Sequence, residues 1–184
     1  MNHPLFSGTN VYLAAPQIEH DAQTLSHWTH DAEFMRLMHA KPARPLSPAE
    51  IKKAYQPDKQ GNDQFEFMIR AGSDERLLGY VRLYGIGWAF GNARLQIGIG
   101  NPRERRKGYG GEALALCVTY AFDELNLNRL TAVTGSYNQG AIRFLEKAGF
   151  KIEVRQRKAL NRAGERWDAM WLGLLAEEWN TTAG

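Results

Sequence analysis

The chain has 184 residues, about the length of one ordinary domain, and 43% of them are apolar. This apolar content supplies a substantial core and excludes a disordered or collagen-like chain. The 23 Lys and Arg residues exceed the 20 Asp and Glu residues by three, an excess that becomes informative only where the positive residues cluster. We therefore expect a single domain over residues 1–184.

The only cysteine, Cys117, cannot form an intramolecular disulfide or a cysteine-based zinc site. A reducing cytoplasm is the compartment that this usage favours. The first ten residues lack the features of a signal peptide, and no stretch reaches the roughly 18 apolar residues that span a bilayer. We expect a cytoplasmic protein without a membrane partner.

The first third is acidic and has the pattern of helices. A short strand is expected at 11–13, followed by helices at 21–28 and 31–38 that each carry an acidic residue near the start, where it complements exposed N–H groups. Ser47, with Glu50 three residues later, is typical of a capping box. Another helix is therefore predicted to run from this pair through Tyr55.

The middle third changes to the period of strands. Phe65, Phe67 and Ile69 alternate with polar or less apolar residues, which predicts a half-buried strand over 65–70. Strands are also predicted over 77–84 and 94–99, and the short connections indicate an antiparallel meander.

The last third returns to alternating helices and strands. Helices are expected over 113–125 and 139–148, the second closed by Gly149 in a left-handed C-cap. Strands are expected over 130–134, 151–157 and 166–175. The pattern as a whole predicts an α/β protein of the α+β kind, with a mixed sheet and helices packed on it.

A basic loop with several glycines lies between the strand ending near Ile99 and the next helix. Such a turn exposes backbone N–H groups at the positive end of a helix, and glycine lets an anion approach them closely. The loop therefore predicts a pyrophosphate cradle, although a solvated glycine-containing loop is an open alternative. It has neither the Gly-Lys-Ser/Thr of a P-loop nor the third-glycine spacing of a dinucleotide fold. Its residues are Arg105, Arg106, Lys107, Gly108, Tyr109, Gly110 and Gly111.

Two motifs in this chain resemble those of the GCN5-related N-acetyltransferase (GNAT) superfamily. Arg105, Gly108 and Gly110 match its Arg/Gln-x-x-Gly-x-Gly/Ala motif. Asn138 and the ending Glu-Lys-Ala-Gly-Phe at 146–150 match a second motif, found in the branch of ribosomal-protein alanine and polyamine acetyltransferases. The resemblance covers nearly the whole chain.

The resemblance implies the fold and the co-substrate. We expect the GNAT acyltransferase fold, a central mixed and mostly antiparallel sheet, splayed at the coenzyme cleft and flanked by helices. Acetyl-CoA would be the co-substrate, with no metal. Its pyrophosphate would bind the basic loop and its pantetheine arm would lie along Ile97, Gly98 and Ile99, in contact with Asn138. Asn138 could equally be a helix cap, and Gly98 and Gly100 could serve ligand approach or sheet curvature.

The family's usual acid and base are not both present. Many relatives carry a Glu where this chain has Gln96, and a Tyr where it has Leu145. A primary amine has a pKa of about 10.4, so its proton must be removed or the amine captured neutral. We expect a water held by Gln96 or Glu66 to take part, and Ser136 to be able to donate to the leaving thiolate. Other candidates in the first third are His27, His30 and His39.

The expected activity is transfer of an acetyl group to a primary amine by direct attack in a ternary complex. The acidic first third suggests a cationic acceptor such as a protein N-terminus, a polyamine or another small amine. A CoA-binding sensor without catalysis is the alternative. A nucleic-acid-binding protein is disfavoured because no aromatic stacking series accompanies the basic runs. A homodimer is possible.

Overall fold

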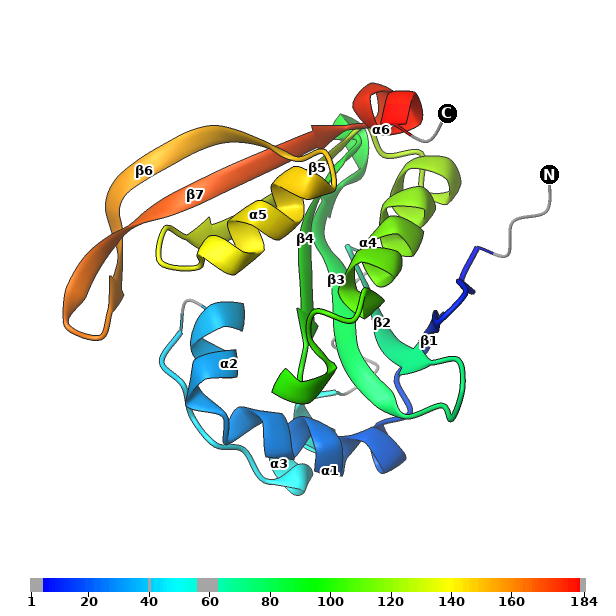
Figure 1. Ribbon diagram of the computed structural model, residues 1–184, viewed down its shortest axis with the longest axis vertical. Helices are drawn as coiled ribbons and strands as arrows, with labels where there is room; N and C mark the ends of the chain where they lie inside the picture. Colours follow the sequence, from blue (N-terminus) through cyan, green and yellow to red (C-terminus); the bar gives the residue numbers. More distant parts are fainter. Residues whose placement is uncertain (1–4, 40, 56–62, 183–184) are drawn as a thin grey trace. The chain divides into compact units, whose positions relative to one another are not determined.

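The computed structural model describes residues 5–39, 41–55 and 63–182 (Figure 1). Its seven-stranded sheet has the order β1-β2-β3-β4-β5-β7-β6 and is mixed, so the predicted fold class is confirmed. The chain divides into two compact units, and β3 (Leu77–Gly87) and β4 (Asn92–Ile99) each run from one into the other. The first unit comprises Met1–Arg82 and Ile97–Cys117, and the second comprises Leu83–Gln96 and Val118–Gly184.

The first unit contains the predicted helical segment. Its β1 strand pairs antiparallel with β2, with Val11 opposite Ala71. In Figure 1 its three helices, coloured blue to cyan, lie beside one another. The elements are β1 (Val11–Ala14), α1 (Ile18–Thr29), α2 (Ala32–Met38), α3 (Pro48–Ala54) and β2 (Gln64–Ala71).

Local hydrogen bonds explain where these helices begin. Asp31 caps α2 by accepting from the N–H groups of Glu33 and Phe34, and the capping box of Ser47 and Glu50 at the start of α3 is confirmed. Helix α1 begins earlier than predicted, at Ile18. The carboxylate of Asp21 accepts from the N–H of Gln17 at 2.8 Å and so draws the preceding residues into the first turn.

The core of the first unit corrects the prediction for β2. Met68 and Ile69 lie on opposite faces of the strand and both are fully buried, so the strand is not half-buried. Helices α1 to α3 cover the face that carries Met68. Glu66, two residues away, shares that face by strand alternation. The buried cluster on this face is Ala22, Leu25, Trp28, Phe34, Ile51, Met68 and Tyr80.

The second unit holds a long antiparallel hairpin. Strands β6 (Lys151–Arg162) and β7 (Glu165–Leu175) both extend beyond their predicted ranges, and β5 (Arg129–Gly135) pairs antiparallel with β7. Helix α5 (Gln139–Lys147) follows β5, and Gly149 takes the predicted left-handed conformation with φ of 94°. Helix α6 (Ala176–Thr182) was not predicted.

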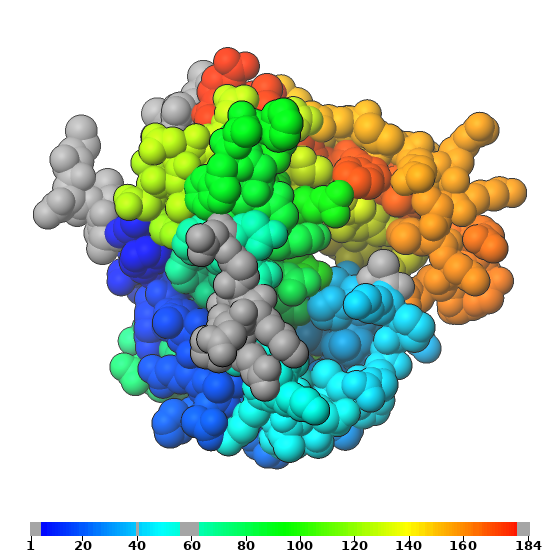
Figure 2. All heavy atoms as spheres, turned by 180° about the vertical axis from the view of Figure 1, so that it is seen from behind, coloured from blue at the N-terminus to red at the C-terminus, as the bar shows by residue number. Residues whose placement is uncertain are grey.

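Strand β6 is solvent-exposed along most of its length, and in Figure 2 its orange side chains stand out from the hairpin. Its pairing with β7 shifts between Gln156 and Leu160, where several residues oppose Asp168. The Asp168 carboxylate accepts from the Lys158 N–H at 2.9 Å and from Arg155 Nε at 2.5 Å. The basic residues of this strand, Arg155, Arg157 and Lys158, are therefore exposed to solvent, as expected for a solvated strand face.

The parallel pairing of β4 with β5 is short. It joins Asn92–Arg94 to Arg129–Thr131. Within the described part of the second unit, no pairing continues beyond these residues, although both strands do. An early end to the pairing is what a splayed sheet requires.

Candidate active site

The basic loop leads into α4 (Tyr109–Thr119), which begins four residues earlier than predicted. Its first intrahelical bond joins the Glu112 N–H to the Gly108 carbonyl, so the N–H groups just before Glu112 precede the helical bonding pattern. Arg106 has a φ of 64° and Gly108 a φ of 92°. Left-handed residues of this kind are typical of nests, in which successive backbone N–H groups bind an anion.

The loop leaves room for an anion near its glycines. A Cβ added at Gly108 or at Gly111 would meet no atom within 4 Å. At Gly108 the left-handed backbone also favours glycine, whereas Gly111 has no such constraint. The geometry of this segment is therefore compatible with the pyrophosphate of CoA.

Arg105 directs its guanidinium back toward β4 rather than out of the loop. Its Nε donates to the Ile99 carbonyl and its Nη2 to the Gly100 carbonyl, both at 3.1 Å. The same group lies 3.9 Å from an Asp31 carboxylate oxygen and 5.7 Å from the ring centre of Phe34. Arg105 thus connects the start of the loop to the end of β4 and to α2.

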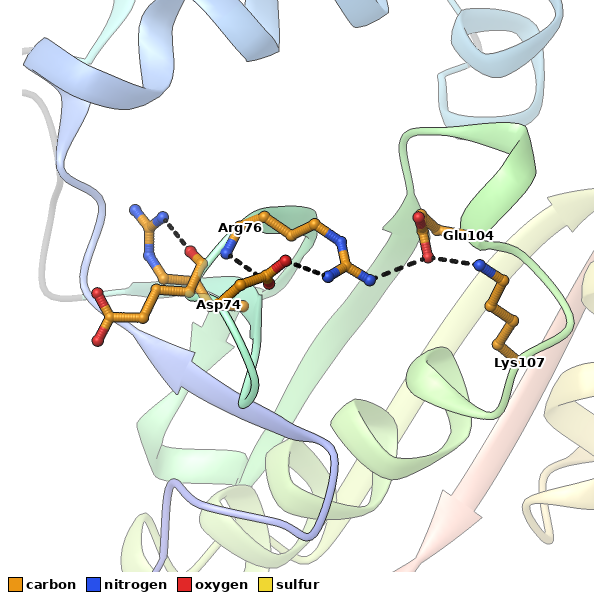
Figure 3. A network of polar contacts seen from close by, with 6 residues as sticks. Asp74, Arg76, Glu104 and Lys107 are labelled. Atoms are coloured by element: carbon orange, nitrogen blue, oxygen red, sulfur yellow. Dashed lines mark hydrogen bonds and ion pairs between the residues drawn. The ribbon is translucent and has the colours of Figure 1, made fainter.

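Lys107 is part of a chain of ion pairs on the surface of the first unit (Figure 3). Its ammonium lies 3.0 Å from Glu104, Glu104 lies 3.4 Å from Arg76, and Arg76 lies 2.5 Å from Asp74. Exposed pairs of this kind contribute little to stability, because solvent screens them. Arg106, by contrast, is exposed beside the nest.

Helices α1 and α2 lie against the end of β4. A Cβ at Gly98 would collide with Met38, and one at Gly100 would collide with the ring of Trp28. The neighbouring strand is equally close, because a Cβ at Gly79 would collide with the Gly98 carbonyl. Close packing of the first unit therefore accounts for these glycines, in addition to the two explanations that the sequence left open. Ile97 and Ile99 flank Gly98 on this strand.

Glu66 belongs to a polar cluster on the helix-covered face of β2 and β3. The Tyr55 hydroxyl, just after α3, donates to its carboxylate. Burial raises the pKa of Glu66, and the Tyr55 hydrogen bond and the positive charge of Arg82 partly offset this rise. Burial also raises the pKa of Tyr55 and of Tyr80, so both phenols are protonated donors near neutral pH.

His39 connects this cluster to the end of β4. Its Nε2 lies 3.3 Å from the Tyr80 hydroxyl, and it directly follows Met38, the side chain packed against Gly98. Burial, together with the charges of Arg82 and Lys41, lowers the pKa of His39, which is therefore neutral near pH 7. The other histidines proposed from the sequence, His27 and His30, are exposed.

Most acidic residues of the helical segment are already bound to neighbouring groups. The buried carboxylate of Asp21 lies 2.7 Å from Arg70, and Glu19 pairs with Lys52. Asp31 and Glu50 serve as helix caps. These four carboxylates therefore have structural partners, whereas Glu33, in the first turn of α2, is exposed.

The second unit carries the remaining predicted site residues. Ser136 and Asp168 exchange two hydrogen bonds, from the Ser136 N–H to the Asp168 carbonyl at 2.9 Å and from the Asp168 N–H to Ser136 Oγ at 3.2 Å. Asn138 accepts from the Ala141 N–H at 3.1 Å and so caps α5. Leu145 is buried, and Gln96 is half-buried in β4.

Cys117 is fully buried in α4, and burial raises the pKa of its thiol to about 12. A thiol with this pKa is a poor nucleophile near neutral pH. The described residues include no group of three or more His, Cys, Asp or Glu side chains placed to bind a metal ion. No described helix is long and apolar enough to cross a membrane.

Sequence reasoning did not identify Tyr55, Tyr80 or Arg82 as site residues. Tyr80 and Arg82 alternate along a predicted strand, which places them on one face, but nothing in the sequence pairs that face with Glu66 or with the end of α3. The only available signal was an arginine within an otherwise apolar strand.

Residues 10–151 match the family model described as the acetyltransferase (GNAT) domain. This match covers more than half of the chain, and the fold agrees with it. The chain therefore belongs to the GNAT family and is an N-acetyltransferase by class.

Individual relatives extend this assignment. The chain is 28% identical over 161 residues to the uncharacterized N-acetyltransferase YnaD of Bacillus subtilis, covering 87% of this chain and 91% of YnaD. It is 29% identical over 138 residues to spermidine N(1)-acetyltransferase of Escherichia coli, covering 75% and 72%.

Among solved structures, spermidine N-acetyltransferase from Vibrio cholerae, in complex with CoA and spermine, superposes with a TM-score of 0.83. It is 20% identical to this chain, and the match covers 92% of this chain and 98% of that one. This likeness supports the fold.

Proposed function

We propose that this protein transfers the acetyl group of acetyl-CoA to the nitrogen of a primary amine, by direct attack in a ternary complex. The observation that carries the proposal is the nest at Arg106 and Gly108 ahead of α4, in a chain of the GNAT family. A helix start combined with a nest is suited to a pyrophosphate. CoA, which the Vibrio cholerae relative binds, contains that group.

In this proposal the backbone of residues 106–111, including Tyr109 and Gly110, binds the pyrophosphate. Arg106 adds positive charge, while Arg105 holds the loop against β4 and Lys107 remains paired with Glu104. The backbone of Ile97, Gly98 and Ile99 pairs with the pantetheine amides as an added strand would. Asn138 contributes a further contact to the arm besides capping α5.

The chemical step needs a neutral amine. The amine nitrogen attacks the thioester carbonyl carbon, the carbon–sulfur bond breaks, and the amine proton is lost to solvent through a water held by Gln96 or Glu66. The leaving thiolate gains a proton, for which the Ser136 hydroxyl is the proposed donor. Since Gln96 cannot accept a proton, the rate should rise through the alkaline range toward the amine's own pKa.

The test is release of CoA thiol from acetyl-CoA across a panel of polyamines, aminoglycosides, amino acids and ribosomal-protein N-terminal peptides, with calorimetric titration of CoA alongside. Saturable binding of CoA together with amine-dependent thiol release supports the proposal. Binding without turnover would favour a CoA-binding sensor, which the departures at Gln96 and Leu145 make the second candidate. Absence of CoA binding would refute both.

The proposal also covers the oligomeric state of the protein and its location in the cell. One structure of the Vibrio cholerae relative is dodecameric. We expect this chain to self-associate at least as a homodimer and to work in the cytoplasm. Analytical ultracentrifugation and cell fractionation test these two expectations.

A further inference from the structure

The first turn of α4 contains N–H groups proposed to bind the pyrophosphate, but few side chains that hold it in place. Gly110 and Gly111 have no side chain, and glycine has the greatest backbone freedom of any residue. Full burial begins only at Ala113 and Leu114. The alignment of the binding groups therefore depends on contacts made close to this turn.

Glu112, between these glycines and the buried part of α4, makes such a contact. Its Oε1 accepts from the Asn10 N–H at 2.8 Å and from the Val11 N–H at 3.4 Å. Its Oε2 accepts from Asn10 Nδ2 at 3.0 Å. The N–H of Glu112 donates to the Gly108 carbonyl at 3.1 Å. One residue thus joins the basic loop and the start of α4 to the chain that enters β1.

The chain that enters β1 is itself held by the first unit. The Asn10 carbonyl accepts from the Gly72 N–H at 2.8 Å, and the Val11 carbonyl accepts from the Gly8 N–H at 2.8 Å. Val11 is buried and pairs with Ala71 of β2. Glu112 is therefore bound to a fixed part of the sheet, which is what a contact that restricts the helix start requires.

The direction of the Glu112 side chain also matters for an anionic ligand. A carboxylate in the first turn of a helix is attracted to the free N–H groups there, and a pyrophosphate needs the same groups. Here Asn10 and Val11 provide donors to both carboxylate oxygens. No side-chain atom of Glu112 lies within 4 Å of a Cβ placed at Gly108. The space beside this glycine is thus left open.

From these contacts we infer that Glu112 is a positioning residue for the coenzyme. Through Asn10 and Val11 it fixes the first turn of α4, so that the N–H groups of the turn are aligned before the pyrophosphate binds. The inference rests on the proposed function and adds to it a residue that acts through the main chain of 108–111. Preorganisation of this kind raises affinity by lowering the ordering cost of binding.

The first test measures CoA affinity by calorimetry and the kinetics of thiol release at varied acetyl-CoA. Glu112→Ala should raise the Kd for CoA and the KM for acetyl-CoA about tenfold, since it removes hydrogen bonds to a charged group. The kcat at saturating acetyl-CoA should be unchanged, because the thioester is at the other end of the coenzyme. Glu112→Gln keeps an oxygen that accepts from the main chain and should stay within about threefold of wild type.

The control for a general loss of stability is Asp21→Asn. It breaks a buried ion pair of the same unit, with Arg70, and should destabilise the fold without changing CoA affinity. Thermal melting of each variant verifies that it is folded at the temperature of the assay.

Gly8 provides a second test that keeps Glu112 in the chain. A Cβ at Gly8 would collide with Glu112 Oε1, so Gly8→Ala displaces the carboxylate from Asn10. This variant should also weaken CoA binding, and it should have no further effect when combined with Glu112→Ala, because both changes break the same contact. Gly72→Ala is the matched control, since its Cβ would make an ordinary contact of 3.4 Å with the Asn10 carbonyl, and it should leave CoA affinity unchanged.

The outcomes separate this inference from the proposed function. If wild type binds CoA and Glu112→Ala binds it equally well or more tightly, the inference is overturned and the proposed function stands. A loss confined to kcat, or additive losses of affinity in Gly8→Ala and Glu112→Ala, would overturn it as well. Where Glu112→Ala does not fold, a normal CoA affinity of Gly8→Ala has the same consequence. Absence of CoA binding to wild type overturns the proposed function and this inference with it.

Discussion

The loop at Arg105–Gly111 and the polar cluster at Glu66 belong to the same unit but differ in what makes each of them suited to bind a ligand. In the loop the main chain provides the site, through left-handed residues and the N–H groups at the start of α4, while two of its three basic side chains are occupied elsewhere. In the cluster the side chains provide the site, brought together from two strands and the ends of two helices. A site made by the main chain can be recognised from glycine spacing. A site made by distant side chains depends on tertiary packing.

The largest expected effect is on stability and concerns Asp21. Asp21→Asn leaves Arg70 without its buried partner and should lower the free energy of unfolding by about 3 kcal/mol. At temperatures where the variant is folded, kcat/KM should match wild type, because this carboxylate holds α1 to β2 and binds no substrate. Chemical denaturation measures the loss. As a control, Glu19→Gln breaks the exposed pair with Lys52 and should cost less than about 1 kcal/mol.

The next effect concerns the main-chain site. Gly108→Leu should lower CoA affinity by about a hundredfold, the equivalent of about 3 kcal/mol, because the side chain fills the space that the pyrophosphate needs. Gly85→Leu is the matched control, since Gly85 also has a positive φ and open surroundings. Both variants carry the same kind of backbone strain, about 1–2 kcal/mol. Equal CoA affinities of the Gly108→Leu and Gly85→Leu variants, measured by calorimetry, would contradict the assignment of the loop as the pyrophosphate site.

A smaller effect is expected at Arg105. Arg105→Met removes the hydrogen bonds to the Ile99 and Gly100 carbonyls, so the loop is held less firmly against β4. Coenzyme affinity should fall about tenfold, consistent with the 1.5–3 kcal/mol of hydrogen bonds from a charged group. Lys107→Met breaks only an exposed pair and should change affinity less than threefold. A larger loss of coenzyme affinity in Lys107→Met than in Arg105→Met would show that side-chain charge, and not the main chain, binds the coenzyme.

The smallest effect concerns the pH dependence of stability through Glu66. Its pKa in the folded state is raised by burial, so it contributes stability at low pH that is lost as the pH rises through that pKa. Relative to wild type, Glu66→Gln should therefore gain thermal stability between pH 4 and pH 7. Melting curves at the two pH values test this. Turnover should fall severalfold in the same variant if Glu66 holds the water that accepts the amine proton.

Gln96→Glu complements that variant in the catalytic assay. It introduces a carboxylate that can accept a proton at this position of β4, so turnover near neutral pH should rise while CoA affinity stays nearly the same. A pH–rate profile is the measurement. A bell-shaped profile near pH 7 that disappears in His39→Gln would identify a histidine as the base and contradict the water route.

The sequence predicted features that depend on neighbouring residues better than those that depend on distant contacts. The caps at Asp31 and Ser47 and the left-handed Gly149 follow from local hydrogen bonding and backbone preference, and all three are confirmed. The pairing of Asp21 with Arg70 was not predicted, because these two residues are far apart in sequence. A sequence shows where a charged residue is. Its role also depends on the oppositely charged residue that the fold places beside it.

The start and end points of the helices and strands were also predicted less well than the presence of these elements. Helix α4 begins at Tyr109, because glycines 110 and 111 are tolerated in a first turn where intrahelical bonds have not yet begun. The burial of Met68 could not be predicted from alternation alone, since it depends on which helices cover the second face of β2.

The close packing of α1 and α2 on β4 limits how this enzyme can evolve. Position 100 accepts only glycine while the ring of Trp28 occupies the adjacent space, whereas the flexible end of Met38 can move away from a side chain at position 98. Position 100 can therefore not acquire a carboxylate or imidazole by a single substitution. New acid–base chemistry on this strand has to arise at its neighbours, of which position 96 is a single nucleotide change away from glutamate, since Gln and Glu codons differ at one base. The packing thus closes position 100 and leaves a short mutational path at position 96 to a different pH optimum.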